Sequence, residues 1–221
     1  MSLQIALCSA MTLDGRLGTD DRRKIRIGSD RDISFLRSLR NEFQGSLMGG
    51  DTFRTWPLPP FRSNKVPYYQ FVRTQKGIQE TLLSDNFSFD RWQQNKLVIL
   101  YSNTNVFEKE SELCKKNCIQ AIHVQNLNPI ELTNYIKATY QCSKILIEGG
   151  GRFCHPFFQA GLIQDIYLTI VPKVMGGQIS TGLCIGEELQ SIEEYKLNKA
   201  EIFNNEIVAH YIRRRALKKE F

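Results

Sequence analysis

ILIEGGGRFCHPFF, residues 145–158, is the stretch of sequence that decides the fold. Three large apolar residues run into the carboxylate of Glu148, and three consecutive glycines, 149–151, follow it. The apolar run predicts a buried strand at 145–147, and the residues after the glycines predict a helix at 152–160. An ordinary turn rarely needs three glycines. Because glycine lets the backbone come close to another group, the stretch predicts a ligand-binding turn between a strand and a helix.

The rest of the chain repeats this alternation of strands and helices. Further strands are expected at 3–8, 45–50, 97–101 and 166–171, and further helices at 30–41 and 129–140. Such alternation predicts a mainly parallel sheet with helices on both faces. Two last strands, 194–203 and 206–213, are expected to close the sheet as an antiparallel hairpin turned at Asn204-Asn205.

Segment 57–96 does not fit this alternation of strands and helices. It is long, rich in Pro, Tyr and Phe, and only weakly periodic. Connections of that length are usually insertions, lids or disordered segments. The chain is therefore expected to be a single domain, 1–221, with an inserted or lid-like segment at 57–96 that acts as a mobile flap.

Composition and charge limit the class of protein. The chain has 221 residues, is 42% hydrophobic and carries a formal net charge of +6. These values indicate a globular domain and favour an anionic partner, such as a phosphorylated small molecule. Much of the excess charge lies in two basic clusters, 22–26 and 213–219, the second of which is interpreted as a solvated tail. Aromatic residues are not interleaved with the basic ones, so a nucleic-acid partner is disfavoured.

The cysteines and the N-terminus bear on the compartment. No apolar run has the length of a membrane helix, and residues 1–7 lack the basic start of a signal peptide. The six cysteines form no zinc-type CxxC pairs and are interpreted as free thiols, which predicts a cytoplasmic protein without a metal. Cys154, beside the glycines, is either a nucleophile or a packing residue, and the lack of a recognisable catalytic partner favours packing.

Two glycine turns are expected at the carboxyl ends of strands, at 48–52 and at 148–151. Ligands of such sheets bind at this edge, and a glycine turn before a helix suits a phosphate. Two such turns would suit the pyrophosphate and sugar of a dinucleotide; the alternative is two ordinary strand-to-helix turns. Neither matches the Rossmann or Walker pattern, so those classes are disfavoured.

Four blocks of sequence in a fixed order carry a family resemblance. They are SAMTLDGR at 9–16, the helix at 29–40 with GGDT at 49–52, ILIEGG at 145–150, and GLIQD at 161–165 with VPKVMGG at 171–177. Together they resemble the reductase domain of bacterial riboflavin biosynthesis, the C-terminal part of a bifunctional deaminase-reductase. The resemblance covers nearly the whole chain except 57–96. It implies an α/β, three-layer dihydrofolate-reductase-like fold, with a mainly parallel sheet and a C-terminal antiparallel hairpin.

The resemblance also implies an activity and a site. Members of the family use NADPH to reduce 5-amino-6-(5-phosphoribosylamino)uracil to the ribitylamino phosphate, and they are commonly homodimers. Carried over position by position, the implied NADPH-binding residues are Ala10, Arg26, Thr52, Ser102, Gly149, Gly150, Gly151, Arg152 and Phe153. The implied substrate-binding residues are Lys24, Arg40, Arg62 and Glu148.

Alternatives remain for several of these residues. Arg40 and Arg62 suit a sugar phosphate, but Arg40 also suits the C-terminus of its helix. Glu148 is expected to act in catalysis by bonding ribose hydroxyls or the ring-opened imine; the alternative is that it satisfies backbone N–H groups. Asp14 is either a catalytic proton carrier or a residue that closes its loop.

The chain also departs from the family pattern. Trp56 stands where the family has an acidic residue, Arg26 replaces a tryptophan, and no zinc-deaminase signature is present. These departures leave open a reductase of the same fold acting on a pterin or another small substrate. A paralogue that binds a nucleotide without catalysis is the third possibility.

Overall fold

The computed structural model describes residues 3–21, 23–62, 67–85, 87–92, 95–124, 128–178 and 181–214. Its strands are β1 (Gln4–Thr12), β2 (Gly45–Gly49), β3 (Tyr68–Thr74), β4 (Asn95–Tyr101), β5 (Gln120–His123), β6 (Lys144–Ile147), β7 (Asp165–Val171), β8 (Tyr195–Phe203) and β9 (Glu206–Arg213). Its helices are α1 (Asp30–Arg40), α2 (Gly50–Thr55), α3 (Gln79–Leu82), the 3₁₀ turn η1 (Phe89–Trp92), α4 (Thr104–Lys116), α5 (Pro129–Tyr140) and α6 (Gly151–Gln159).

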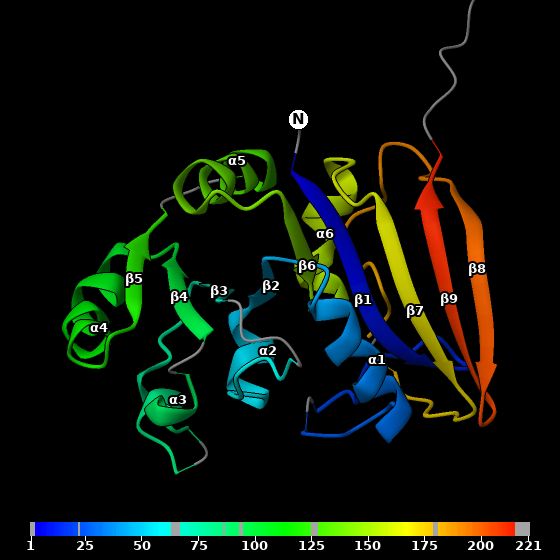
Figure 1. Cartoon of the computed structure of the whole chain (residues 1–221), viewed down its shortest axis with the longest axis horizontal. Coiled ribbons are helices and arrows are strands. Elements are labelled where there is room, and N and C mark those ends of the chain that lie inside the picture. Colours follow the sequence, from blue (N-terminus) through cyan, green and yellow to red (C-terminus); the bar gives the residue numbers. More distant parts are fainter. Residues whose placement is uncertain are drawn as a thin grey trace, which may run out of the picture.

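The strands form one sheet in the order β5-β4-β3-β2-β6-β1-β7-β9-β8 (Figure 1). Neighbouring strands from β5 to β7 are parallel, whereas β9 is antiparallel to both β7 and β8. The predicted mainly parallel sheet with a C-terminal hairpin is therefore confirmed. The hairpin turns at Asn204 and Asn205, whose φ angles are 46° and 69°. Asparagine tolerates this left-handed conformation better than most residues do.

Helices cover both faces of the sheet, so the fold has three layers. Side chains alternate between the two faces along a strand, and β6 shows the result. Ile145 and Ile147 belong to the hydrophobic cluster that includes residues of α5 and α6. Leu146, between them, belongs to the cluster that includes Leu39 of α1. A third cluster includes Phe53 of α2 together with residues of β4 and α4.

The expectation that 57–96 forms an aperiodic insertion is wrong for much of its length. Residues 68–74 form β3, which lies between β2 and β4 inside the sheet. Tyr68, Phe71 and Val72 are completely buried, and Phe87 and Trp92 lie in the core further along. A strand buried on both faces has no polar–apolar alternation, which hides it from a reading by period. Residues 63–66, 86 and 93–94, also part of the predicted flap, lie outside the described residues.

Two more elements have no counterpart in the sequence-based expectation. Helix α4 and strand β5 lie at the outer end of the sheet, beyond β4 (Figure 1).

The C-terminal basic cluster, interpreted as a solvated tail, begins with Arg213, whose side chain is bound to other parts of the protein. Arg213 forms an ion pair with Glu193 and donates a 2.5 Å hydrogen bond to the carbonyl of Gly161. Arg22 and residues 215–219 of the two basic clusters lie outside the described residues.

Candidate active site

The candidate site lies where β2, β6 and β1 end side by side. These three neighbouring parallel strands are followed by α2, by Glu148 and α6, and by the loop that begins at Leu13. Parallel strands end at the same edge of a sheet, and ligands of such sheets bind at the carboxyl edge. The two glycine turns expected from the sequence therefore lie next to one another.

The helices that begin at these two turns, like α3, are not capped by the side chain of their N-cap residue. Gly49 is the N-cap of α2 and Gly150 is the N-cap of α6, and neither helix start receives a side-chain cap. By contrast, α1, α4 and α5 are capped by the side chains of Ser29, Asn103 and Asn128. The first N–H groups of a helix have no partner within the helix and carry a partial positive charge. Two adjacent helix starts are thus suited to receive an anion.

The glycines of the turns serve different purposes. A Cβ at Gly49 or Gly149 would lie 3.0 or 2.9 Å from the ring of Phe153, so both glycines make room for that ring. A Cβ at Gly151 would lie 2.1 Å from the carbonyl oxygen of Gly182. A Cβ at Gly150 would meet nothing within 4 Å. A Cβ at Gly50 would lie 2.4 Å from the hydroxyl oxygen of Thr74. Four of the five glycines thus leave room for other atoms of the protein, and Gly150 alone of the five faces open space.

Glu148 and Arg40 form a forked ion pair at the end of β6. Arg40 Nε donates to Glu148 Oε1 at 2.9 Å, and Arg40 Nη2 donates to Glu148 Oε2 at 2.5 Å. The side chain of Arg40 is only 13% exposed, and that of Glu148 only 10%. Burial opposes the charge of Arg40, but the Glu148 carboxylate outweighs it and raises the pKa of Arg40. The guanidinium thus holds Glu148, rather than capping the end of α1.

Three further side chains surround this pair. Burial, and then the Glu148 charge, raises the pKa of the Cys8 thiol and of the Tyr68 hydroxyl, so both stay protonated. The guanidinium of Arg62 lies 4.4 Å from the centre of the Tyr68 ring. Burial lowers the pKa of Arg62, and the nearby charge of Arg40 acts in the same direction. The structure therefore brings together three predicted residues, Arg40, Arg62 and Glu148.

Cys8 and Tyr68 were missed by sequence reasoning. Cys8 lies on β1 beside the end of β6, and Tyr68 begins β3, in the segment interpreted as an insertion. Tyr68 is fully buried although it carries a hydroxyl group. A signal was present in residues 68–74, YYQFVRT, whose aromatic and β-branched residues favour a strand.

Asp14 is tied to a second loop. Its carboxylate accepts hydrogen bonds from Thr12 Oγ1 at 2.5 Å, from the N–H of Gly176 at 2.7 Å and from the N–H of Met175 at 3.2 Å. These donors, the Thr12 hydroxyl foremost, lower the pKa of Asp14 to about 2. A carboxylate with such a low pKa is a poor proton carrier near neutral pH. The geometry favours the loop-closing role.

Lys24 and Arg26 lie on the loop between β1 and α1. Lys24 Nζ lies 4.5 Å from the centre of the Trp56 ring, which directly follows α2. Arg26 donates to the carbonyl of Gly28 at 3.1 Å and pairs with Asp30 at 2.5 Å. These two contacts lie at the start of α1, and neither of them involves a glycine turn.

The remaining predicted cofactor residues are spread along the same edge. Ala10 is on β1, Thr52 in α2, and Arg152 and Phe153 in the first turn of α6. Ser102 follows β4 and donates from its backbone and side chain to the carbonyl of Thr74. Cys154 is fully buried, and burial raises its pKa to about 12, so the packing interpretation holds for it.

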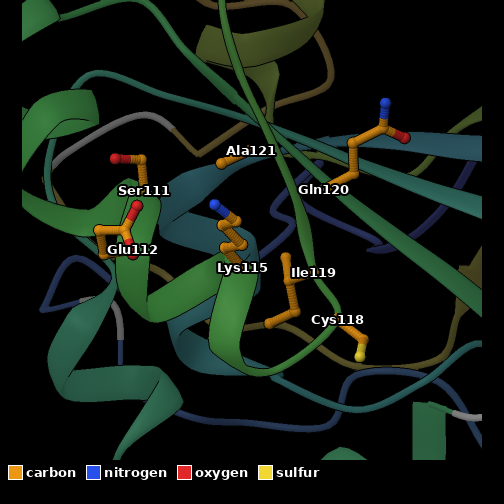
Figure 2. A pocket seen from close by; sticks show the side chains of 7 residues that line it. All are labelled: Ser111, Glu112, Lys115, Cys118, Ile119, Gln120 and Ala121. Atoms are coloured by element: carbon orange, nitrogen blue, oxygen red, sulfur yellow. The ribbon is translucent and has the colours of Figure 1, made fainter.

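A hollow lies elsewhere in the molecule, away from the ends of β2, β6 and β1. Figure 2 shows it between α4 and β5, about 400 Å³ in volume and lined by residues such as Glu112, Lys115 and Gln120. In the part of the chain that the structure describes, no three His, Cys, Asp or Glu side chains are grouped to hold a metal. The same residues contain no helix long and apolar enough to cross a membrane.

Comparison with known proteins agrees with this arrangement. Residues 4–209 match the family model described as the RibD C-terminal domain. The riboflavin biosynthesis protein RibD of Aquifex aeolicus is 27% identical over 210 residues, which is 90% of this chain and 54% of that protein. The chain therefore spans about half the length of this curated relative.

Solved structures share the fold. A pyrimidine reductase-like protein from Corynebacterium diphtheriae superposes with a TM-score of 0.79 at 16% identity, over 96% of this chain and 92% of that one. The deaminase/5-amino-6-(5-phosphoribosylamino)uracil reductase of Thermotoga maritima gives 0.70 at 12% identity, over 96% and 57%. Dihydrofolate reductase from Enterococcus faecalis, complexed with NADP(H), gives 0.54 at 13% identity, over 96% and 97%.

The family match extends from β1 into β9 and so includes every strand of the sheet and both glycine turns. The solved structures place the same chain among dihydrofolate-reductase-like folds. The chain therefore belongs to the RibD C-terminal domain family.

Proposed function

We propose that this protein is an NADPH-dependent reductase of riboflavin biosynthesis that reduces 5-amino-6-(5-phosphoribosylamino)uracil to the ribitylamino phosphate. One observation carries the proposal. Two helix starts without side-chain caps, at Gly49 and Gly150, lie on neighbouring strands beside the buried Glu148–Arg40 pair. An anion site and a charged pair thus adjoin at the edge where such sheets bind ligands.

The residues at this edge fit a dinucleotide. Gly150 faces open space, and the first N–H groups of α6 receive no side-chain cap, so the backbone there can lie against a phosphate. Thr52, in the first turns of α2, and Arg152, exposed at the start of α6, add polar and charged groups beside the two turns. NADPH, when bound, supplies the hydride; the protein positions it.

The charged pair fits the substrate side. Arg40 fixes both carboxylate oxygens of Glu148, so the carboxylate is held in one orientation. In that position it can accept hydrogen bonds from ribose hydroxyls or stabilise a cationic imine. Arg62 and Lys24 are the neighbouring cations proposed to bind the substrate phosphate, since a guanidinium and an ammonium both suit phosphate oxygens.

A second candidate is a reductase of the same fold with another substrate. The observation that favours it is the contact of Lys24 with Trp56, which places an aromatic ring next to a proposed substrate residue. A flat pterin would stack on such a ring. A nucleotide-binding paralogue without catalysis is the third candidate.

Oxidation of NADPH with each substrate type separates these candidates. We expect turnover with the aminouracil ribosyl phosphate and none with dihydrofolate. Turnover with dihydrofolate alone would favour the second candidate. Binding of NADPH with no turnover on either substrate would favour the third.

We further propose that the protein is a homodimer that acts in the cytoplasm. The outer hairpin of β8 and β9 exposes Leu197, Ile202 and Ile207, which are 49%, 77% and 40% exposed, and a second copy is the simplest cover for them. All six cysteines are free, which fits a reducing compartment. Sedimentation of the wild type and of Ile202→Glu tests the dimer, and equal masses for the two would argue against this surface.

A further inference from the structure

The connection between β7 and β8 makes contacts far beyond its own strands. It spans residues 172–194, of which 172–178 and 181–194 are described, and these contain no helix or strand. Along this length it contacts first the loop after β1 and then the first turns of α6. Both regions border the proposed cofactor site.

The first attachment is Asp14. Its carboxylate accepts from the N–H groups of Met175 and Gly176, and the N–H of Leu13 donates to the carbonyl of Lys173 at 2.8 Å. The Thr12 hydroxyl bonds the same carboxylate and holds it in place. One side chain thus joins the end of β1 to the start of the connection.

The contacts continue along the loop after β1. The N–H of Gln178 donates to Asp20 at 2.8 Å, and Asp20 in turn pairs with Arg16. Beyond residues 179–180, the N–H of Leu17 donates to the carbonyl of Thr181 at 2.9 Å. Thr181 Oγ1 also donates to the carbonyl of Gly18 at 2.8 Å. The two loops are therefore fastened along most of their length.

The second attachment is on α6. The N–H of Ile185 donates to the carbonyl of Gly151 at 3.1 Å, and a Cβ at Gly151 would collide with Gly182. One turn later, His155 Nε2 donates to the carbonyl of Glu187 at 2.7 Å. Gly186 lies flat against the His155 ring, where a Cβ would come within 2.5 Å. The connection thus braces the helix start whose Gly150 N-cap is open.

We propose that residues 172–178 and 181–187, fastened to the loop after β1, act as a strap that positions the first turn of α6 for the cofactor, with Asp14 and His155 as its two attachments. Asp14 is then a positioning residue rather than a catalytic one. The part of this inference that concerns the cofactor rests on the proposed function; the mechanical coupling between Asp14 and α6 does not.

Hydrogen exchange of the ligand-free protein tests the coupling by itself. Asp14→Asn keeps the size of the side chain but weakens its acceptance from the two backbone N–H groups. We expect faster exchange at 175–178 and also at 152–155 in α6, where Asp14 has no contact of its own. Glu194→Gln is the matched control, since its pair with Arg214 at the far end of the connection is exposed. Faster exchange confined to 175–178 would overturn the strap.

A double-mutant cycle tests the consequence for the cofactor. Asp14→Asn and His155→Phe are each expected to raise the Kd of NADPH about tenfold, or ~1.4 kcal/mol. Because both act through one strap, the double variant should resemble the single variants. Independent sites would instead add, giving about a hundredfold. Glu194→Gln should leave the Kd unchanged.

The outcomes distinguish the two proposals. If the wild type binds no NADPH, the proposed function fails, and the exchange experiment still decides the strap. If the wild type binds NADPH and both single variants bind it equally well, the strap has no role in the site. A purely structural Asp14 would lower Tm in Asp14→Asn and leave both the Kd and the exchange of α6 unaltered.

Discussion

Glu148 is the proposed catalytic residue whose orientation the structure defines most sharply, because both of its carboxylate oxygens accept hydrogen bonds from Arg40. Glu148→Gln keeps the shape, loses the charge and leaves a buried guanidinium without its ion pair. We expect kcat/KM to fall by about 10- to 100-fold, the equivalent of a lost charge-assisted bond of roughly 1.5–3 kcal/mol. We also expect Tm to fall, because breaking a buried pair is destabilising.

The Kd of NADPH separates these two effects. Since Glu148 is proposed to face the substrate, NADPH should bind Glu148→Gln nearly as tightly as it binds the wild type. Arg40→Met serves as the partner control, since it frees the carboxylate while keeping the bulk of the side chain. A Glu148→Gln enzyme with lower Tm but unchanged kcat/KM would remove Glu148 from the chemistry.

Gly150 and Gly151 offer a matched pair of substitutions. A Cβ at Gly150 meets nothing of the protein, whereas one at Gly151 lies 2.1 Å from the carbonyl oxygen of Gly182. We therefore expect Gly150→Ala to keep its Tm and to bind NADPH about tenfold more weakly, or ~1.4 kcal/mol. Gly151→Ala should instead lose stability. Thermal melts with and without NADPH measure both effects, and tight binding by Gly150→Ala would show that no phosphate lies there.

Asp14 predicts a specific dependence of stability on pH. Its pKa is lowered from 3.8 to about 2, so its ionised form is favoured by folding. That contribution is complete above the unfolded pKa of 3.8 and is lost as the pH falls through about 2. The difference in Tm between the wild type and Asp14→Asn should thus be constant above pH 4 and shrink toward pH 2. A difference independent of pH over this range would contradict the assignment.

At the scale of elements, the sequence predicted the helices and strands that have regularly spaced apolar residues or a recognisable residue at one end. Helix α5 was expected at 129–140 and is found there, with Asn128 and Glu131 forming a capping box ahead of an apolar face. The end of β6 followed from three apolar residues meeting Glu148. Strand β3 was missed because it is buried on both faces and so has no polar–apolar alternation. Its polar Gln70 is buried as well and accepts a hydrogen bond from Ser46, 24 residues away, a partner that no local pattern reveals.

Part of the site was likewise beyond local patterns. The sequence and the family resemblance indicated Arg40 and Glu148, but not that they bind each other across 108 residues. The five glycines of the two turns were expected to serve a ligand; four of them instead leave room for Phe153, Thr74 or Gly182. Such contacts depend on how distant loops meet.

Glu110 gives an element-scale prediction for the misread segment. This residue of α4 is 3% exposed and accepts hydrogen bonds from the N–H groups of Ile78 and Gln79 and from Tyr101. It thereby fastens the start of α3 to α4. Glu110→Ala leaves these buried donors without an acceptor, which costs ~1–3 kcal/mol for each donor. The substitution should therefore lower the free energy of unfolding by at least ~2 kcal/mol. Urea unfolding measures it, with exposed Glu112→Ala as the control; equal losses in the two variants would contradict the role.

At the scale of the whole molecule, the features proposed to bind a ligand lie together at the carboxyl edge of the sheet. The β2-β6-β1 ends carry the two uncapped helix starts and the Glu148–Arg40 pair, and the strap from β7 crosses to α6 beside them. The hollow between α4 and β5 lies beyond β4, at the far end of the sheet (Figures 1 and 2). We therefore propose that the dinucleotide binds at the β2-β6-β1 edge and not in this hollow.

Hydrogen exchange of the wild type with saturating NADPH tests this proposed binding place most directly. We predict slower exchange at the start of α2, 50–53, and at the start of α6, 151–154, with no change at 111–121 around the α4–β5 hollow. NADH at the same concentration provides the comparison for the 2′-phosphate. Protection at 111–121 with none at the two helix starts would contradict the site, the roles of its glycines and the proposed function together.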